Sequence, residues 1–125
     1  MTSNLRFGFV LEYVTDIEAV KRFYVDVVGL QIEREAPVFV QFKDEAGANY
    51  AIASDAPTGG GTEPEVYWLT DDAEAAYAEL SRRAPVGVPL TQKPFGKVFG
   101  IIDPAGQAAY IVQLAADRPS RPPGA

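Results

Sequence analysis

The first hydrophobic pattern along the chain is an alternation with a period of two. In the stretch RFGFVLEYV the apolar side chains fall on Phe7, Phe9, Leu11 and Tyr13. Strict alternation of this kind is typical of a strand with one buried face. We therefore predict a strand over residues 6–14, with these four side chains on one face.

The pattern changes to a helical spacing after Asp16, which is a suitable N-cap residue. Apolar residues then recur every three or four positions, and the last of them are Val27 and Val28. The next residue is Gly29, which can adopt the left-handed conformation that ends many helices. One amphipathic helix is expected over residues 17–28.

Short segments rich in β-branched and aromatic residues follow, which indicates strands. In the first half they lie at residues 30–34, 37–43 and 49–54. Residues 55–62 read DAPTGGGT, the composition of a flexible connector. The second half repeats the order, with strands at 65–70, 86–90, 97–102 and 107–114 and a helix over about 72–83.

The repeat defines two βαβββ units, over about residues 5–55 and 63–114. Neither unit can cover its own helix stripe and sheet face, so the units must pair, within one chain or between chains. We expect an α+β fold of curled mixed sheets, forming one domain over residues 1–116, with a ligand site in the cleft. The Pro- and Arg-rich residues 117–125 are predicted to be a disordered tail.

Composition removes several classes of chemistry. The chain has no His and no Cys. Zinc sites of the Cys/His kind, Ser-His-Asp triads and thiol nucleophiles are therefore excluded from a single chain. The remaining ligand types are carboxylate, hydroxyl, amide and carbonyl oxygens, which suit Mg, Ca or Mn.

The net charge of −6 disfavours nucleic acid and anionic membranes as partners and favours cationic ligands. Acidity that serves only solubility is the alternative reading. No apolar run approaches the length of a membrane span and no leader pattern precedes residue 10, so we expect a cytoplasmic protein.

Three stretches in order carry a resemblance to a known family. They are VTDIEAVKRFYVDVVGL at residues 14–30, YWLTDDAEAAYAEL at 67–80 and PFGKVFGIIDPAG at 94–106. In the last, Asp103 to Gly106 predict a tight turn between two strands. The chain resembles the vicinal oxygen chelate superfamily, which includes glyoxalase I, bleomycin-resistance proteins, extradiol dioxygenases and methylmalonyl-CoA epimerase.

The resemblance implies four positions where metal-dependent members supply His, Glu or Gln ligands. In this chain they fall on Phe9, Ala51, Glu65 and Tyr110. Only Glu65 could hold a hard cation tightly. We therefore expect no metal cofactor, with Mn or Mg as the alternative.

A metal-free pocket would need apolar walls with a few polar groups. The candidate ligand-binding residues are Phe9, Phe39, Ala51, Glu65, Tyr67, Phe95, Phe99 and Tyr110, and Trp68 is a further stacking candidate. Ordinary core packing is the alternative for each aromatic residue. Glu65, the one candidate catalytic residue, could be a counter-ion, a base or a solvated residue at a strand end.

The resemblance favours a homodimeric binding protein that sequesters a small aromatic or cationic molecule, as in antibiotic resistance. One alternative is a lyase, epimerase or dioxygenase that uses a divalent metal, and another is a metal-free enzyme with Glu65 as base. A third is a partner-binding module whose cleft is filled by its own side chains. An open cavity of several hundred Å³ with aromatic walls would favour ligand binding over that module.

Overall fold

The computed structural model describes residues 5–115, which fold in the order strand, helix and three strands, twice over. The first unit contains β1 (Arg6–Tyr13), α1 (Ile17–Arg22), the π-helix η1 (Phe23–Val28), β2 (Gln31–Ala36), β3 (Phe39–Lys43) and β4 (Asn49–Ala53). The second contains β5 (Glu65–Leu69), α2 (Ala73–Leu80), β6 (Val86–Lys93), β7 (Gly96–Ile102) and β8 (Ala108–Leu114). The predicted tail, residues 117–125, lies outside the described residues.

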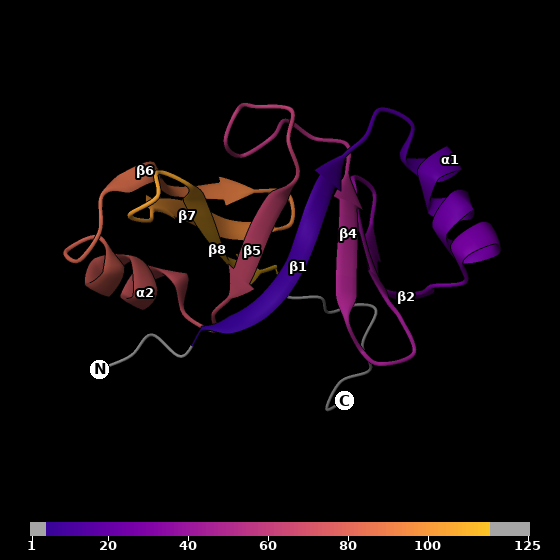
Figure 1. Ribbon diagram of the computed structural model, residues 1–125, viewed down its shortest axis with the longest axis horizontal. Helices are drawn as coiled ribbons and strands as arrows, with labels where there is room; N and C mark the ends of the chain where they lie inside the picture. The colour runs from indigo at the N-terminus through magenta and orange to yellow at the C-terminus, as the bar shows by residue number, and fades with distance from the viewer. Residues whose placement is uncertain (1–4, 116–125) are drawn as a thin grey trace.

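All eight strands form one mixed sheet in the order β2-β3-β4-β1-β5-β8-β7-β6. The central strands β1 and β5 are antiparallel, and they pair in parallel with β4 and β8 respectively. The two units are therefore joined within one chain, which settles the point that the sequence left open. The helices lie toward the two ends of the sheet (Figure 1). The predicted α+β fold class is confirmed.

The predicted helix over residues 17–28 exists, but its second half is a π-helix. Asp16 caps the start, accepting from the Ala19 N–H at 3.0 Å. At the end Gly29 has φ 91°, and its N–H donates to the Tyr24 carbonyl five residues back. A π-helix has more residues per turn than an α-helix, so the side chains at the end of η1 point in other directions than an α-helix would give them. Val27 and Val28, which were expected on the apolar stripe, are 71% and 50% exposed.

The inner face of the sheet, opposite the helices, carries the main core. Its buried members are Phe9, Leu11, Phe39, Ala51, Ala53, Tyr67, Phe95, Val98, Tyr110 and Val112. Phe39 from β3 stacks on Phe95, which precedes β7, with ring centroids 4.9 Å apart. Side chains from both units thus meet and fill this part of the cleft. None of the helices within residues 5–115 is long and apolar enough to cross a membrane.

Candidate functional site

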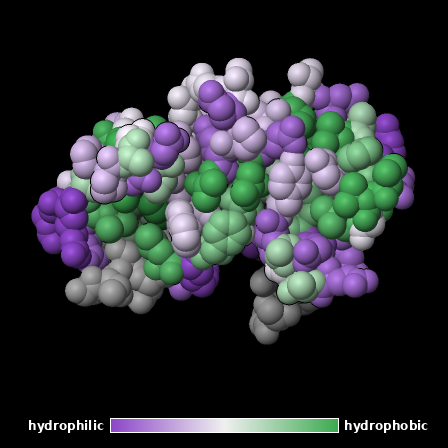
Figure 2. All heavy atoms as spheres, viewed as in Figure 1, coloured by the Kyte–Doolittle hydropathy of each residue, from purple (hydrophilic) through white to green (hydrophobic). Residues whose placement is uncertain are grey.

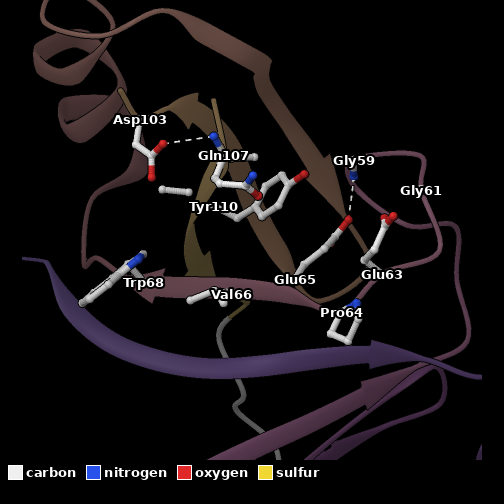
Figure 3. Close-up of a pocket in the computed structure, with 12 residues that line it drawn as sticks. Gly59, Gly61, Glu63, Pro64, Glu65, Val66, Trp68, Asp103, Gln107 and Tyr110 are labelled. Atoms are coloured by element: carbon white, nitrogen blue, oxygen red, sulfur yellow. Dashed lines mark hydrogen bonds between the residues drawn. The ribbon is translucent and has the colours of Figure 1, made fainter. Parts of the chain in front are cut away.

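A pocket of about 650 Å³ opens where β5 and β8 begin. Its lining residues come from the connector, from both strands and from the turn between β7 and β8. They are Gly59, Gly61, Glu63, Pro64, Glu65, Val66, Trp68, Asp103, Gln107, Ala108, Ala109 and Tyr110. In Figure 3, Glu63 and Glu65 lie toward one side of the pocket, and Asp103 and Trp68 toward the other.

The pocket exists because β5 and β8 do not pair along their whole length. Their ladder begins at Tyr67 opposite Tyr110 and continues to Leu69 opposite Val112. The preceding residues of both strands line the pocket. The connector and the β7–β8 turn form its sides. Asp103 stabilises that turn by accepting hydrogen bonds from the N–H groups of Ala105 and Gln107.

Glu65 is a buried carboxylate at the inner end of this pocket. It is 7% exposed. Its Oε1 accepts from the hydroxyls of Tyr13 at 2.8 Å and Tyr67 at 2.9 Å, and its Oε2 accepts from the Gly59 N–H at 2.8 Å. Three donors to one carboxylate offset the cost of taking a charge out of water.

The tyrosines that hold Glu65 are themselves held by the connector. The Thr58 hydroxyl lies 2.6 Å from that of Tyr67, and the Thr58 N–H donates to the Tyr13 hydroxyl at 3.2 Å. Burial raises the pKa of Tyr13 to about 12 and also raises the pKa of Tyr67. Both hydroxyls therefore stay protonated at neutral pH and remain donors to Glu65.

Tyr110 forms the aromatic wall on the β8 side. Its ring stacks on Tyr67 with centroids 5.4 Å apart. Burial raises its pKa, and so do the negative charges of Glu65 and Glu63. A Cβ on Gly59 would overlap the Tyr110 hydroxyl, so the connector can lie this close only with glycine there.

The electrostatic character of the pocket is negative. Among the described residues that line it, Glu63, Glu65 and Asp103 carry carboxylates, and none is Lys or Arg. The chain as a whole has a net charge of −6. Such a cavity attracts cations and repels anions.

The structure divides the sequence-predicted residues into three groups. Glu65 and Tyr110 line the pocket. Phe9, Phe39, Ala51, Tyr67 and Phe95 belong to the inner core. Phe99 lies on the opposite face, in a cluster with Ala76 of α2 and Ile111. Neither the core group nor Phe99 lines the pocket.

Sequence reasoning missed most of the polar lining, namely Glu63, Asp103 and Gln107. The only available signal was the DPAG turn, because it places residues at the start of the last strand. Trp68, which the sequence offered only as a stacking residue, also lines the pocket.

The four residues that the family resemblance implies for metal positions do not suit a metal ion. Phe9 and Ala51 have no donor atom, and a Tyr110 hydroxyl that stays protonated is a poor ligand. This leaves Glu65, whose oxygens already accept three hydrogen bonds. Within residues 5–115 no group of three or more acidic side chains is arranged to hold a metal.

Residues 6–109 match the Glyoxalase/Bleomycin resistance protein/Dioxygenase superfamily. The chain belongs to this superfamily. No curated protein is similar enough in sequence to count as a relative.

Solved structures share the fold at low sequence identity. A Vibrio splendidus member of the same superfamily has a TM-score of 0.59 and 24% identity, over 88% of this chain and 99% of that one. Methylmalonyl-CoA epimerase from Mycobacterium tuberculosis has a TM-score of 0.67 and 14% identity, over 93% of each chain. A structure described as NAD-dependent benzaldehyde dehydrogenase from Legionella pneumophila has a TM-score of 0.68 and 21% identity, over 85% and 97%. At these identities the likeness concerns the fold alone.

Proposed function

We propose that this chain binds a small organic cation, such as a protonated amine or a quaternary ammonium compound, in the pocket between β5 and β8. The observation that carries the proposal is the lining itself. A cavity of about 650 Å³ holds three carboxylates and no basic side chain among its described residues. Its volume falls in the usual range of small-molecule sites.

The pocket offers a cation both charge and aromatic surface. Glu65 supplies a buried negative charge, and Glu63 adds a second one nearby, since both act on the pKa of Tyr110. Tyr110 and Trp68 are also among the lining residues, and the faces of aromatic rings attract cations. A ligand here would need no metal ion.

The enzymatic alternatives have less support in this geometry. Metal-assisted lyase, epimerase or dioxygenase chemistry needs ligands that Phe9 and Ala51 cannot supply. Proton abstraction by Glu65 would form an anion in a pocket that also holds the carboxylates of Glu63 and Asp103, which disfavour it. The three donors on Glu65 also suit a permanent counter-ion better than a proton acceptor.

The partner-binding alternative rests on the filled interior around Phe39 and Phe95. The pocket lies outside that filled region and has the aromatic walls and volume expected of a ligand site. We therefore favour a small ligand over a macromolecular partner.

A thermal-shift experiment on the metal-stripped chain tests the proposal. Tetramethylammonium, the uncharged and water-soluble analogue tert-butanol, acetate, Mg²⁺ and Mn²⁺ are compared at equal ionic strength. Tetramethylammonium at a hundred times its Kd should stabilise the fold by about 2.7 kcal/mol and raise Tm by several degrees. The neutral analogue and acetate should not. Stabilisation by micromolar Mn²⁺ and none by the cation would overturn the proposal.

A further inference from the structure

The outer face of the two central strands is left uncovered by the helices. On it lie three apolar side chains, Phe7, Val66 and Trp68, which we call the outer strip. They are 52%, 39% and 36% exposed. Figure 2 shows hydrophobic residues over the middle of the molecule, and a further group over the end that carries α1. Large aromatic side chains exposed together commonly mark a binding surface.

A local irregularity creates this strip. Strict alternation would put Phe7 on the same face as Phe9, but the register of β1 against β5 shifts between them. Phe7 therefore faces outward opposite Trp68, and the two rings meet edge to face with centroids 5.6 Å apart. Gly8 occupies the shift, where a Cβ would lie 2.8 Å from the Tyr67 carbonyl oxygen.

The outer strip is continuous with the pocket. Val66 and Trp68 belong to both, since each lines the pocket and is partly exposed on the outer face. Phe7 lies next beyond Trp68. The apolar wall of the pocket thus extends onto the surface, away from Glu63 and Glu65.

Charge argues against a second copy of this chain as the occupant of the strip. A two-fold contact through the strip would cover Val66 and Trp68, which also line the acidic pocket, on both chains. Two chains of net charge −6 would also have to approach each other. A cationic ligand, in contrast, is attracted by the carboxylates of the pocket.

We propose that the pocket and the outer strip form one extended site for an amphiphilic organic cation. The ammonium group occupies the acidic pocket, and a flat aromatic or apolar group attached to it lies over Trp68 and Phe7. This inference rests on the proposed function and adds the second half of the ligand. Phe7 is then a specificity residue that contacts the apolar group.

The test uses the fluorescence of Trp68, the only tryptophan of the chain. The full-length protein is titrated with tetramethylammonium, which carries the charge alone, and with naphthylmethyl-trimethylammonium, which adds a flat group. The second probe should bind about tenfold more tightly, since about 1.4 kcal/mol corresponds to a factor of ten. It should also shift the emission of Trp68.

Phe7→Ala should abolish most of the tenfold gain and leave the Kd of tetramethylammonium unchanged. The matched control is Phe23→Ala, because Phe23 is 49% exposed but lies on η1. That control should behave as the wild type with both probes.

The outcomes separate the two proposals. If neither cation binds, the proposed function fails, and this inference fails with it. If tetramethylammonium binds but the naphthyl group adds nothing, only the extended site is wrong. The homodimer that the family resemblance predicts is measured in parallel by light scattering. If Phe7→Ala turns a dimer into a monomer and leaves both affinities unchanged, the strip is an interface between copies and the extended site is overturned.

Discussion

Glu63 and Glu65 are the same residue type two positions apart, yet the structure gives them different surroundings. Glu65 is buried and accepts three hydrogen bonds, whereas Glu63 is exposed on the connector. Both line the pocket. A charge that is fixed by donors contributes to the fold and to ligand binding, whereas an exposed charge contributes to binding alone.

Exchange of each residue for glutamine separates these contributions. Glu65→Gln puts an amide group among donors that need an acceptor, so we expect it to lower the free energy of unfolding by about 1–3 kcal/mol. Glu63→Gln should change it by less than about 0.5 kcal/mol. Urea denaturation measures both. Equal stability of the two variants would contradict the role given to Glu65.

At the scale of elements, the connector between β4 and β5 forms one wall of the pocket. It is held to the sheet by the Thr58 and Gly59 contacts and, further back, by an ion pair between Lys93 and Asp55 with N and O 2.9 Å apart. Both side chains of that pair are mostly buried. The composition DAPTGGGT predicted flexibility, but it could not reveal these tertiary contacts.

Gly59→Ala should displace this wall. The added methyl group would overlap the Tyr110 hydroxyl, so either the connector or the ring must move. We expect a lower Tm and weaker cation binding. Gly61→Ala is the control for Tm alone, because its Cβ would meet only the carboxylate end of Glu63, 2.7 Å away, and that flexible group can shift. If both variants behave as the wild type, the connector does not shape the pocket.

The elements also show which structural features the sequence could predict. The caps at Asp16 and Gly29, the turn at Asp103 and the order of the elements followed from local chemistry and spacing. The strand predicted at residues 86–90 instead runs to Lys93, because edge pairing with β7 continues to Gly96. Strand ends depend on the partner strand, which local patterns do not contain.

The candidate site was less predictable for the same physical reason. The shift at Gly8 turns Phe7 outward, and the phase of β7 turns Phe99 toward α2. A displacement of one residue exchanges the two faces of a strand. Glu65 and Tyr110 could be placed from the family resemblance. The gap between β5 and β8 that forms the pocket could not be predicted from the sequence, because it depends on where the pairing of the two strands begins.

For the whole molecule, the buried tyrosines predict a loss of stability in alkali. The pKa of Tyr13 rises from 10.0 to about 12 on folding, and that of Tyr67 rises as well, in both cases mainly through burial. The folded state thus holds protons that the unfolded state releases. The stabilisation from Tyr13 is complete below pH 10 and is lost as the pH rises to about 12.

Urea denaturation at several pH values measures this effect. Between pH 10 and 12 the free energy of unfolding of the wild type should fall, and Tyr13→Phe should show a shallower fall. From pH 7 to 9 the difference between the two proteins should stay constant. If the free energy of unfolding of Tyr13→Phe fell as steeply as that of the wild type between pH 10 and 12, the assignment of this pH dependence to Tyr13 would be contradicted.

The central claim is that the three carboxylates of the pocket bind an organic cation. Its most direct test is calorimetric titration of tetramethylammonium into the wild type and into the variant Glu63→Gln with Asp103→Asn, at low and at physiological salt. We predict that each lost carboxylate weakens binding by about threefold to fivefold, roughly 0.6–1 kcal/mol for a partly exposed charge. Added salt should weaken the wild type more than the variant. Binding of equal strength in both proteins and at both salt concentrations would contradict the claim.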